Sequence, residues 1–372
     1  MKKILLVFGT RPEAIKMAPL VKAFQKDTHN FQTKVCVTAQ HREMLDQVLA
    51  FFDIQADFDL DLMKPNQNLY SLTADIVTGM KPVLEDFQPD YVFVHGDTTT
   101  TMATSIAGFY SGAKVCHIEA GLRTFNKRAP FPEEINRQVT GRIADYHFAP
   151  TTKSQQNLLQ ENVPAESILV TGNTVIDALL ESVERANQLE GHHEIESVKA
   201  KVNFDKEIIL VTGHRRENHG QGFLNICEAL RKISEQSDAE IIYPVHLNPN
   251  VQKPVYKLLG ELPNVHLIDP LSYPAFVWLM DKAKLIITDS GGVQEEAPSL
   301  GKPVLVMRDT TERPEAVEAG TVILVGTDKE KIQFEALDLI NNSKRYEQMS
   351  MLHNPYGDGK ACERVVEFMR EL

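Results

Sequence analysis

The chain has 372 residues, enough for two domains with sizeable cores, and its composition is that of a soluble globular protein. Its formal net charge of -12 argues against nonspecific nucleic-acid binding, so an anionic ligand requires a local pocket of cationic side chains. No apolar run approaches the roughly 20 residues that span a bilayer, which argues against a membrane partner.

Short apolar runs rich in Val and Ile alternate with amphipathic helical patterns along the whole chain. This alternation predicts an α/β protein with two Rossmann-like, doubly wound parallel-sheet domains. In the first half we expect strands at 3–8, 34–38, 91–95, 114–118, 146–149 and 168–171. In the second half we expect strands at 208–212, 241–245, 265–268, 285–288, 304–307 and 322–325.

After Gly172 we expect a helical segment to about Gln188, followed by a polar stretch, GHHEIESVKAKVNFDKE, that separates the two series of strands. We place the domain linker near residues 172–205. The predicted domains are residues 1–172 and residues 173–358, which include the linker. The apolar face of the tail, residues 359–372, predicts a helix that packs back on the first domain. Two doubly wound halves are expected to face a central ligand cleft, lined by the carboxyl ends of both sets of strands.

The N-terminal run MKKILLVFGT leads directly into a Gly-Thr-Arg-Pro turn, so we expect a first strand there and not a signal peptide. The cysteines show no CxxC pair and lie mostly in apolar or helical patterns. Buried free thiols in a reducing compartment, the cytoplasm, are the expectation for Cys36, Cys116, Cys227 and Cys362.

Polar residues follow each predicted strand, where the chemistry of an open parallel sheet collects. After the first strand, Arg11 and Lys16 flank the start of a helix at Pro12. Two cations near a helix N-terminus suggest a pyrophosphate site. The alternative is that both are solvated charges on a helix face.

Three carboxylates occupy comparable positions further along the chain. Asp97 follows the strand at 91–95, and Glu119 follows the strand at 114–118. Glu133 lies in the first turn of a helix that begins at Pro132, with Arg137 one turn on. Separately, Asp97 fits a helix N-cap, and Glu133 with Arg137 fits a surface ion pair. Together, three acids in one cleft are expected to raise at least one pKa and to supply a proton donor and a proton acceptor.

The second domain offers candidates for binding a diphosphate. His214 lies beside two arginines after the strand at 208–212, and Arg313 precedes Pro314 at a helix start. A structural role for the histidine is the alternative. Phe276 lies in a helical pattern where it either stacks on a base or belongs to the core.

The stretch KLIITDSGGVQEEAP joins a strand, a glycine turn and a helix. We expect the turn at Ser290, Gly291 and Gly292 to bind phosphate, with the helix starting at Val293. Glu295 and Glu296 lie one turn into that helix, where an acid beside phosphate needs another task, and holding ribose hydroxyls is one such task. An ordinary helix N-terminus is the alternative. The histidines lack metal-ligand spacing, and no GxGxxG is followed by a ribose-binding acid, so neither a metal nor another cofactor is expected.

An ordered set of strings from Gly9 to Gly359 closely resembles the non-hydrolysing bacterial UDP-N-acetylglucosamine 2-epimerases: GTRPEAIKMAP, TAQHREMLDQVL, HGDTTTT, HIEAGLRT, FPEEINRQ, GHRRENHG, HLNPN, DSGGVQEEAPSLGKP and NPYGDG. The resemblance implies a GT-B architecture, a homodimer, and interconversion of UDP-N-acetylglucosamine with UDP-N-acetylmannosamine for a cell-surface polysaccharide. It implies a mechanism of UDP elimination to 2-acetamidoglucal, followed by re-addition of UDP. A glycosyltransferase, a hydrolysing epimerase and a non-catalytic sensor are the alternatives.

The resemblance also implies roles for individual residues. Asp97, Glu119 and Glu133 are the acid/base candidates, and His214 is counted with them as a catalytic residue that stabilises UDP. The implied contacts to substrate and UDP are Arg11, Lys16, Arg137, Phe276, Ser290, Gly291, Gly292, Glu296 and Arg313. Some relatives bind a second substrate molecule as an activator, which points to Gln40, His41 and Glu43 here. Two positions depart from the family, since Asn66 replaces an arginine and Leu271 replaces a glutamine found in some relatives.

Overall fold

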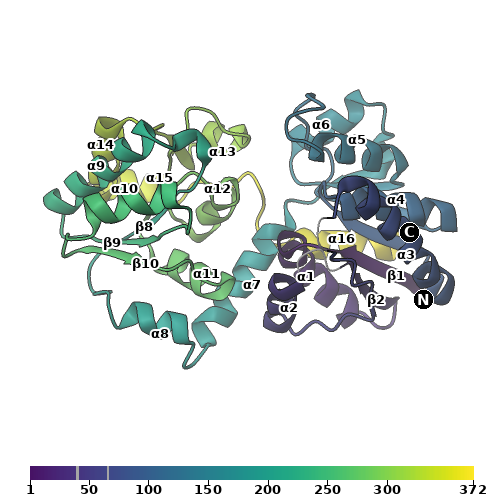
Figure 1. Ribbon diagram of the computed structural model, residues 1–372. Helices are drawn as coiled ribbons and strands as arrows, with labels where there is room; N and C mark the ends of the chain where they lie inside the picture. The colour runs from purple at the N-terminus through teal and green to yellow at the C-terminus, as the bar shows by residue number, and fades with distance from the viewer. Residues whose placement is uncertain (39–41, 65–66) are drawn as a thin grey trace. The chain divides into compact units, whose positions relative to one another are not determined.

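The computed structural model describes residues 1–38, 42–64 and 67–372. The candidates Gln40, His41 and Asn66 lie outside the described residues. The chain forms two compact units, which Figure 1 shows. The N-terminal unit comprises Met1–Ala178 and Tyr356–Leu372, and the C-terminal unit comprises Leu179–Pro355.

The N-terminal unit is built on a parallel sheet with the order β3-β2-β1-β4-β5-β6-β7. Its strands are β1 (Lys2–Phe8), β2 (Phe31–Val37), β3 (Phe58–Asp59), β4 (Tyr91–His95), β5 (Lys114–Ile118), β6 (Tyr146–Ala149) and β7 (Ile168–Val170). Its helices are α1 (Arg11–Lys26), α2 (Arg42–Phe51), α3 (Leu69–Phe87), α4 (Thr99–Ser111), α5 (Glu133–Ile143), α6 (Thr152–Gln160) and α16 (Ala361–Glu371), and α7 (Thr174–Gln188) begins in it.

Helices cover both faces of this sheet because its strands are apolar on both sides. On one face, Val92 and Val94 pack in a cluster with residues of α3 and α4. On the other face, Phe93 contacts Phe24 of α1, and Phe148 contacts Phe368 of α16. Figure 1 shows α16, in yellow, beside α1.

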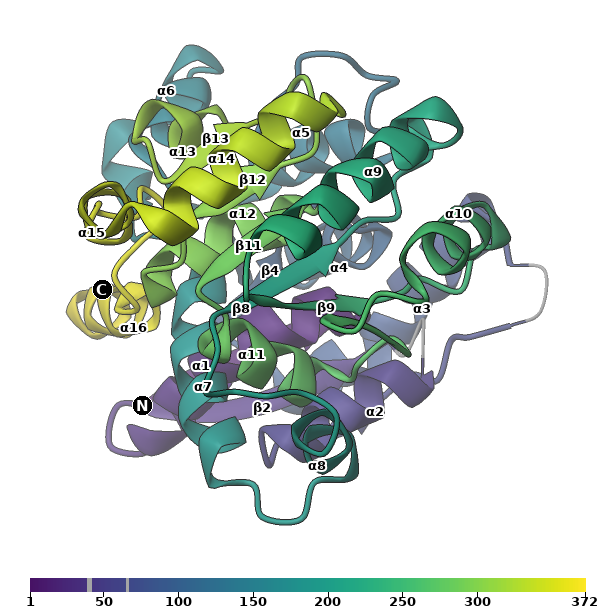
Figure 2. The same ribbon diagram turned by 90° about the vertical axis from the view of Figure 1, so that its left-hand side faces the viewer.

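The C-terminal unit has a second parallel sheet with the order β10-β9-β8-β11-β12-β13. Its strands are β8 (Ile208–Thr212), β9 (Glu240–Pro244), β10 (Val265–Ile268), β11 (Leu285–Thr288), β12 (Val304–Val306) and β13 (Val322–Leu324). Its helices are α8 (His193–Lys199), α9 (Gln221–Gln236), α10 (Pro249–Leu259), α11 (Tyr273–Lys282), α12 (Gly291–Glu296), α13 (Pro314–Glu318), α14 (Lys329–Asn341) and α15 (Ser343–Ser350). Figure 2 shows α9 and α14 side by side, and both contribute to the main core of this unit.

The prediction of two doubly wound parallel-sheet domains is confirmed. Several details differ from the prediction, among them some strand bounds, such as Phe31–Val37 for the strand expected at 34–38. The edge strand Phe58–Asp59 was missed, because two residues show no periodicity. The predicted helical segment that ends near Gln188 is confirmed as α7, but the polar stretch after it contains α8, which buries Ile195 and Val198 against the rest of its unit. The division between the units falls inside α7, where the prediction placed it at residue 172.

The described part of the chain has no helix long and apolar enough to cross a membrane. All four cysteines are buried free thiols, as predicted. Burial raises the pKa of Cys36 and of Cys227 to about 12, so these thiols stay protonated at neutral pH.

Adjacent leucines on α6 allow a test of the core beneath the candidate site. Leu158 is fully buried in a cluster with Ala120 and Ala149, whereas Leu159 is 42% exposed. We expect Leu158→Ala to destabilise the N-terminal unit by about 2–5 kcal/mol, because it leaves a cavity. Native-state hydrogen exchange of the β5 and β6 amides measures this loss. The matched control Leu159→Ala should change it by no more than about 1 kcal/mol; equal losses would contradict this account of the core.

Candidate active site

The structure distributes the predicted site residues over both units. Those in the N-terminal unit are Arg11, Lys16, Asp97, Glu119, Glu133 and Arg137. Those in the C-terminal unit are His214, Phe276, Ser290, Gly291, Gly292, Glu296 and Arg313. Glu43, the described member of the predicted activator site, is exposed in the first turn of α2.

The strand order of the N-terminal sheet places the loops after β1 and β4 side by side, since these two strands pair with each other. Glu13 fastens the loops together. Its carboxylate accepts hydrogen bonds from the backbone N–H groups of Gly9 at 3.1 Å and Thr10 at 2.8 Å, and from the Thr98 hydroxyl at 2.6 Å. Burial raises the pKa of Glu13, and these hydrogen bonds oppose the rise.

Sequence reasoning missed Glu13. The available signal was the spacing from Thr10 to Glu13, which is that of a capping box, and the structure contains that box at the start of α1. The capping role is local, whereas the bond to Thr98 depends on the strand order. Arg11, which begins α1, is thereby held at a defined distance from the loop that carries Asp97.

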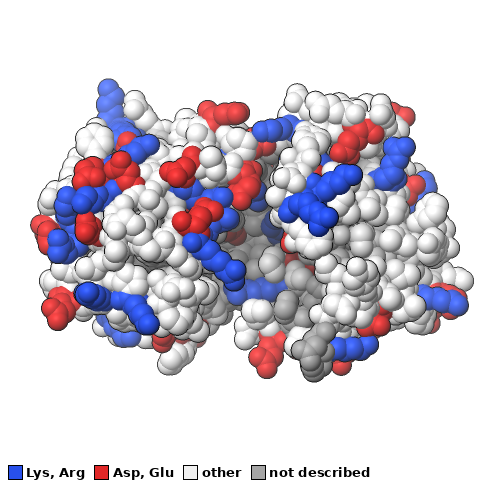
Figure 3. Space-filling model, turned by 45° about the horizontal axis from the view of Figure 1, so that its top comes forward, with Lys and Arg blue, Asp and Glu red and all other residues white. Residues whose placement is uncertain are grey.

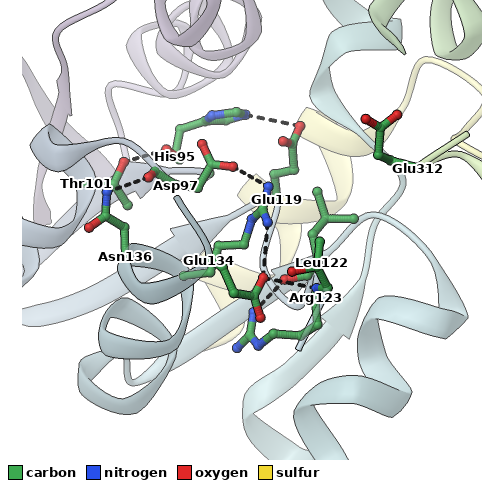
Figure 4. A network of polar contacts seen from close by, with 12 residues as sticks. His95, Asp97, Thr101, Glu119, Leu122, Arg123, Glu134, Asn136 and Glu312 are labelled. Carbon is green, nitrogen blue, oxygen red and sulfur yellow. Dashed lines mark hydrogen bonds and ion pairs between the residues drawn. The ribbon is translucent and has the colours of Figure 1, made fainter. Parts of the chain in front are cut away.

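Glu119 lies at the end of β5 in a dense polar environment. It forms an ion pair with Lys16 and accepts a hydrogen bond from Asn173 Nδ2 at 3.0 Å. Figure 4 shows the His95 ring pointing toward this carboxylate, with His95 Nε2 3.6 Å from Glu119 Oε2. The backbone of Glu119 has φ 60, a left-handed conformation that is unfavourable for a residue with a side chain. Such local strain clusters at functional sites.

His95 is a neutral partner for that carboxylate. Burial lowers the pKa of His95 to about 4, although the charge of Glu119 opposes this shift. The imidazole is therefore uncharged near neutral pH, and Lys16 supplies the positive charge next to Glu119. Sequence reasoning did not single out His95, because a histidine inside an apolar strand gives no sign of which side chain it faces.

Asp97 is held by Arg137. Arg137 Nη2 lies 2.5 Å from Asp97 Oδ2. Asn136 Nδ2 donates to the Asp97 carbonyl at 2.9 Å, and Figure 4 shows these two residues side by side. Arg137 also contacts Glu134 at 3.2 Å. Glu133 and Arg137 form no ion pair, so the predicted alternative of a surface pair between them is wrong. Within the described residues, Glu133 Oε2 is buried and has no hydrogen-bond partner.

Glu134, which sequence reasoning passed over, supports this arrangement. Its buried carboxylate accepts hydrogen bonds from the backbone N–H groups of Thr124 and Phe125, both at 3.0 Å. Burial raises the pKa of Glu134, but these bonds and the contact with Arg137 outweigh it and lower the pKa below its usual value. Asp97 and Glu119 thus each have a cationic partner. The expectation that the acids repel one another left these cations out of account.

In the C-terminal sheet, too, a buried carboxylate holds the loop that follows a strand. β8 pairs with β11, so the loop that follows β8 lies beside the start of α12. Asp289, fully buried, accepts hydrogen bonds from the backbone N–H groups of His214 and Arg215, both at 2.9 Å. Arg215 Nε donates in turn to the Asp289 carbonyl at 2.9 Å. This carboxylate therefore fixes the loop of His214, and it too was missed.

The glycine pair begins α12 instead of preceding it, so the predicted helix start at Val293 is wrong. Neither Gly291 nor Gly292 has a positive φ. A Cβ atom added at Gly291 would meet Arg215 Nη2 at 3.9 Å, and one at Gly292 would meet Glu296 Oε2 at 3.7 Å, both ordinary contacts. Neither backbone conformation nor internal packing therefore requires glycine at these two positions. Phosphate binding at this turn stays a prediction.

Most cations near this turn are paired. Arg313 forms an ion pair with Glu295, and Arg308 forms one with Glu312. Glu312 is also 3.6 Å from Arg215. Burial raises the pKa of Glu312, but the Arg308 guanidinium outweighs it and the pKa falls to about 2. Figure 3 shows acidic and basic side chains interspersed over the face in view, in keeping with the absence of a broad basic surface among the residues described there.

Phe276 is half-buried in α11. This exposure fits neither a fully buried core residue nor a fully exposed stacking ring. The start of α11 is anchored by Glu194 of α8, whose carboxylate accepts a hydrogen bond from the Ser272 backbone N–H at 3.2 Å. The predicted linker thus supports the helix that carries Phe276. In the parts of the chain that the structure describes, no cluster of His, Cys, Asp and Glu could hold a metal ion.

The neutral state of buried His95 predicts a pH dependence of stability. The unfolded imidazole binds a proton below its pKa of about 6.5, while the folded one stays neutral down to about 4, so stability falls as pH falls between these values. Replacing His95 by Gln removes this effect. From pH 7 to pH 5, the unfolding free energy of the variant should gain about 2 kcal/mol relative to the wild type.

Hydrogen exchange of the N-terminal unit measures the difference in unfolding free energy between His95→Gln and the wild type at each pH. His193→Gln, at an exposed position on α8, serves as the control and should follow the wild type at both pH values. A constant gap between His95→Gln and the wild type would show that the imidazole is not held neutral.

Comparison with known proteins gives a consistent result. The family model described as UDP-N-acetylglucosamine 2-epimerase matches residues 22–370. The UDP-N-acetylglucosamine 2-epimerase of Salmonella typhimurium is 58% identical over 372 residues, covering 99% of this chain and 98% of the relative.

Solved structures agree with this match. The Neisseria meningitidis UDP-GlcNAc 2-epimerase bound to UDP-GlcNAc superposes with a TM-score of 0.87 at 52% identity, covering 100% of both chains. The Methanocaldococcus jannaschii UDP-GlcNAc 2-epimerase in complex with UDP-GlcNAc and UDP superposes with a TM-score of 0.78 at 34% identity, again covering 100% of both chains.

Proposed function

The chain belongs to the UDP-N-acetylglucosamine 2-epimerase family, and from this we propose that it interconverts UDP-N-acetylglucosamine and UDP-N-acetylmannosamine by elimination and re-addition of UDP. The family consists of isomerases. The observation that carries the mechanism is the placement of Asp97 and Glu119 at the ends of adjacent strands, each beside a cation. The sugar nucleotides bound in the related structures support the choice of ligand.

In the elimination step, the C2–H bond and the bond from C1 to the diphosphate oxygen break, and a double bond forms between C1 and C2. The proton passes to a carboxylate of the protein, and UDP leaves with the electron pair of the C1–O bond. In the return step a carboxylic acid delivers a proton to the opposite face of C2, and UDP adds again to C1. Because the two faces of C2 need different groups, the reaction requires more than one of Asp97, Glu119 and Glu133.

The cations have a corresponding role in this proposal. Lys16 and Arg137 contact the acids and hold them in fixed positions. Fixed positive charge also stabilises negative charge that develops on the departing diphosphate. We assign the binding of UDP in the C-terminal unit to His214, Arg313, the turn at Ser290 to Gly292, and Glu296 for the ribose.

Three further parts of the proposal rest on family resemblance. They are a homodimer, a cytoplasmic location, and use of the product in a cell-surface polysaccharide. Light scattering tests the homodimer, fractionation of cells tests the location, and analysis of surface glycans in a deletion strain tests the use of the product.

Replacement of Asp97 by Asn tests the proposed chemistry. Incubation of the wild type with UDP-N-acetylglucosamine in D2O should give the manno epimer with deuterium at C2. In Asp97→Asn, kcat should fall by about 10²–10⁴, because one proton-transfer group is lost. The matched control is Asp338→Asn, which also removes a carboxylate paired with an arginine, Arg345, and it should keep wild-type turnover.

The products of the same incubation decide between the alternatives. No deuterium at C2 and no manno product would refute the epimerase. Free N-acetylmannosamine with UDP would identify a hydrolysing enzyme, and sugar transfer to an acceptor with C2 unchanged would identify a glycosyltransferase.

A further inference from the structure

We propose that Asp289 is a positioning residue that sets the tautomer of His214, so that Nδ1 carries a proton directed at Asp289 and Nε2 is the nitrogen presented to UDP. The inference rests on the proposed function for the role of His214. It goes beyond that function, because it assigns a task to a carboxylate that neither the sequence motifs nor the site prediction singled out.

The two oxygens of Asp289 have different environments. Oδ2 accepts the backbone N–H groups of His214 and Arg215 at 2.9 Å, and Asn218 Nδ2 lies 3.4 Å away. Oδ1 is buried and has no hydrogen-bond partner anywhere in the described chain. The imidazole of His214 lies next to Oδ1, and the distance from His214 Nδ1 to Asp289 Oδ1 is 3.7 Å.

A buried carboxylate oxygen without a hydrogen bond is costly, so a donor within reach is strongly favoured. The separation of 3.7 Å is longer than a hydrogen bond, but the His214 side chain is 51% exposed and has room to turn. His246 stacks on the His214 ring, with centroids 5.2 Å apart and planes at 14°. Small changes in the side-chain torsions of His214 change the distance from Nδ1 to Oδ1.

Three charged or titratable groups face His214. They are the carboxylate of Asp289, at the end of β11, the imidazole of His246, after β9, and the guanidinium of Arg215, in the same loop as His214. Burial lowers the pKa of His246, and His214 lowers it further, so His246 stays neutral near pH 7. The carboxylate therefore decides which nitrogen of His214 is protonated and supports positive charge beside a departing diphosphate.

The simpler interpretation is that Asp289 only holds the loop through its backbone contacts. Asp289→Asn separates the two roles. The amide oxygen can still accept from the N–H groups of His214 and Arg215, while the amide NH2 replaces Oδ1 and donates to Nδ1. The variant should keep the loop and reverse the tautomer.

The experiment uses the full chain with histidine labelled with 13C at Cε1 and 15N in the ring. NMR spectra from pH 5.5 to 8.5 report the tautomer and the titration of each imidazole, and His214→Gln identifies the His214 signal. In the wild type, Nδ1 should carry the proton of the neutral ring. In Asp289→Asn, Nε2 should carry it, and kcat at pH 7 should fall tenfold or more with KM changed less than threefold.

Asp177→Asn is the matched control. Asp177 is also a buried carboxylate that accepts two backbone N–H groups, those of Ala361 and Cys362, and its replacement should leave the His214 signals unchanged. An unchanged tautomer of His214 in Asp289→Asn would overturn the proposal. If that variant does not fold, a wild-type His214 protonated at Nε2 in the neutral ring would overturn it equally. The spectra need no substrate, so a failed epimerase assay would refute the proposed function and leave this result standing.

Discussion

Buried carboxylates at the carboxyl ends of the two sheets hold together the loops that carry the candidate site residues. In each sheet, the loops in question follow two adjacent parallel strands at the point where the strand order reverses. Beyond the last ladder bond, the backbone N–H groups of these loops need new acceptors. Glu13 supplies them in one unit and Asp289 in the other.

A carboxylate suits this position because it accepts several hydrogen bonds at once and binds N–H groups more strongly than a neutral acceptor does. Its burial is unfavourable, as the raised pKa of Glu13 shows, and the bonds it accepts offset that cost. The need of the loop N–H groups for acceptors also explains why each carboxylate bonds to two consecutive N–H groups. The loop then has one conformation, which a catalytic side chain on it needs.

Much of the fold was predictable because its strands are apolar runs of Val, Ile and Leu, and strands such as Tyr91–His95 and Leu285–Thr288 agree with the prediction in both bounds. The helix α7 was predicted, but α8 was assigned to a polar linker, because polar composition was taken for a lack of structure. Ile195 and Val198 show that two apolar residues on one face suffice to anchor a short helix when a neighbouring element is present.

The candidate site was predictable only where a residue follows a strand directly. Asp97, Glu119 and His214 were identified by that position, but their partners were not. Arg137 contacts Asp97 and not Glu133, because the strand order brings α5 to the end of β4 while the sequence shows only the spacing along one helix. Residues that bridge two loops cannot be found from local patterns, since their role exists only once the strands are paired.

The two units differ in which charged groups surround the carboxylates at the strand ends. In the N-terminal unit, Glu119 is ionically paired with Lys16 beside a histidine that burial keeps neutral. In the C-terminal unit the relation is inverted, since a buried carboxylate faces a half-exposed histidine and no lysine or arginine is paired with Asp289 among the residues described. A cation beside a carboxylate keeps that carboxylate ionised and so able to accept a proton, whereas an unpaired carboxylate attracts positive charge on the group that it faces. The first arrangement suits proton transfer at carbon, and the second suits stabilisation of a departing anion.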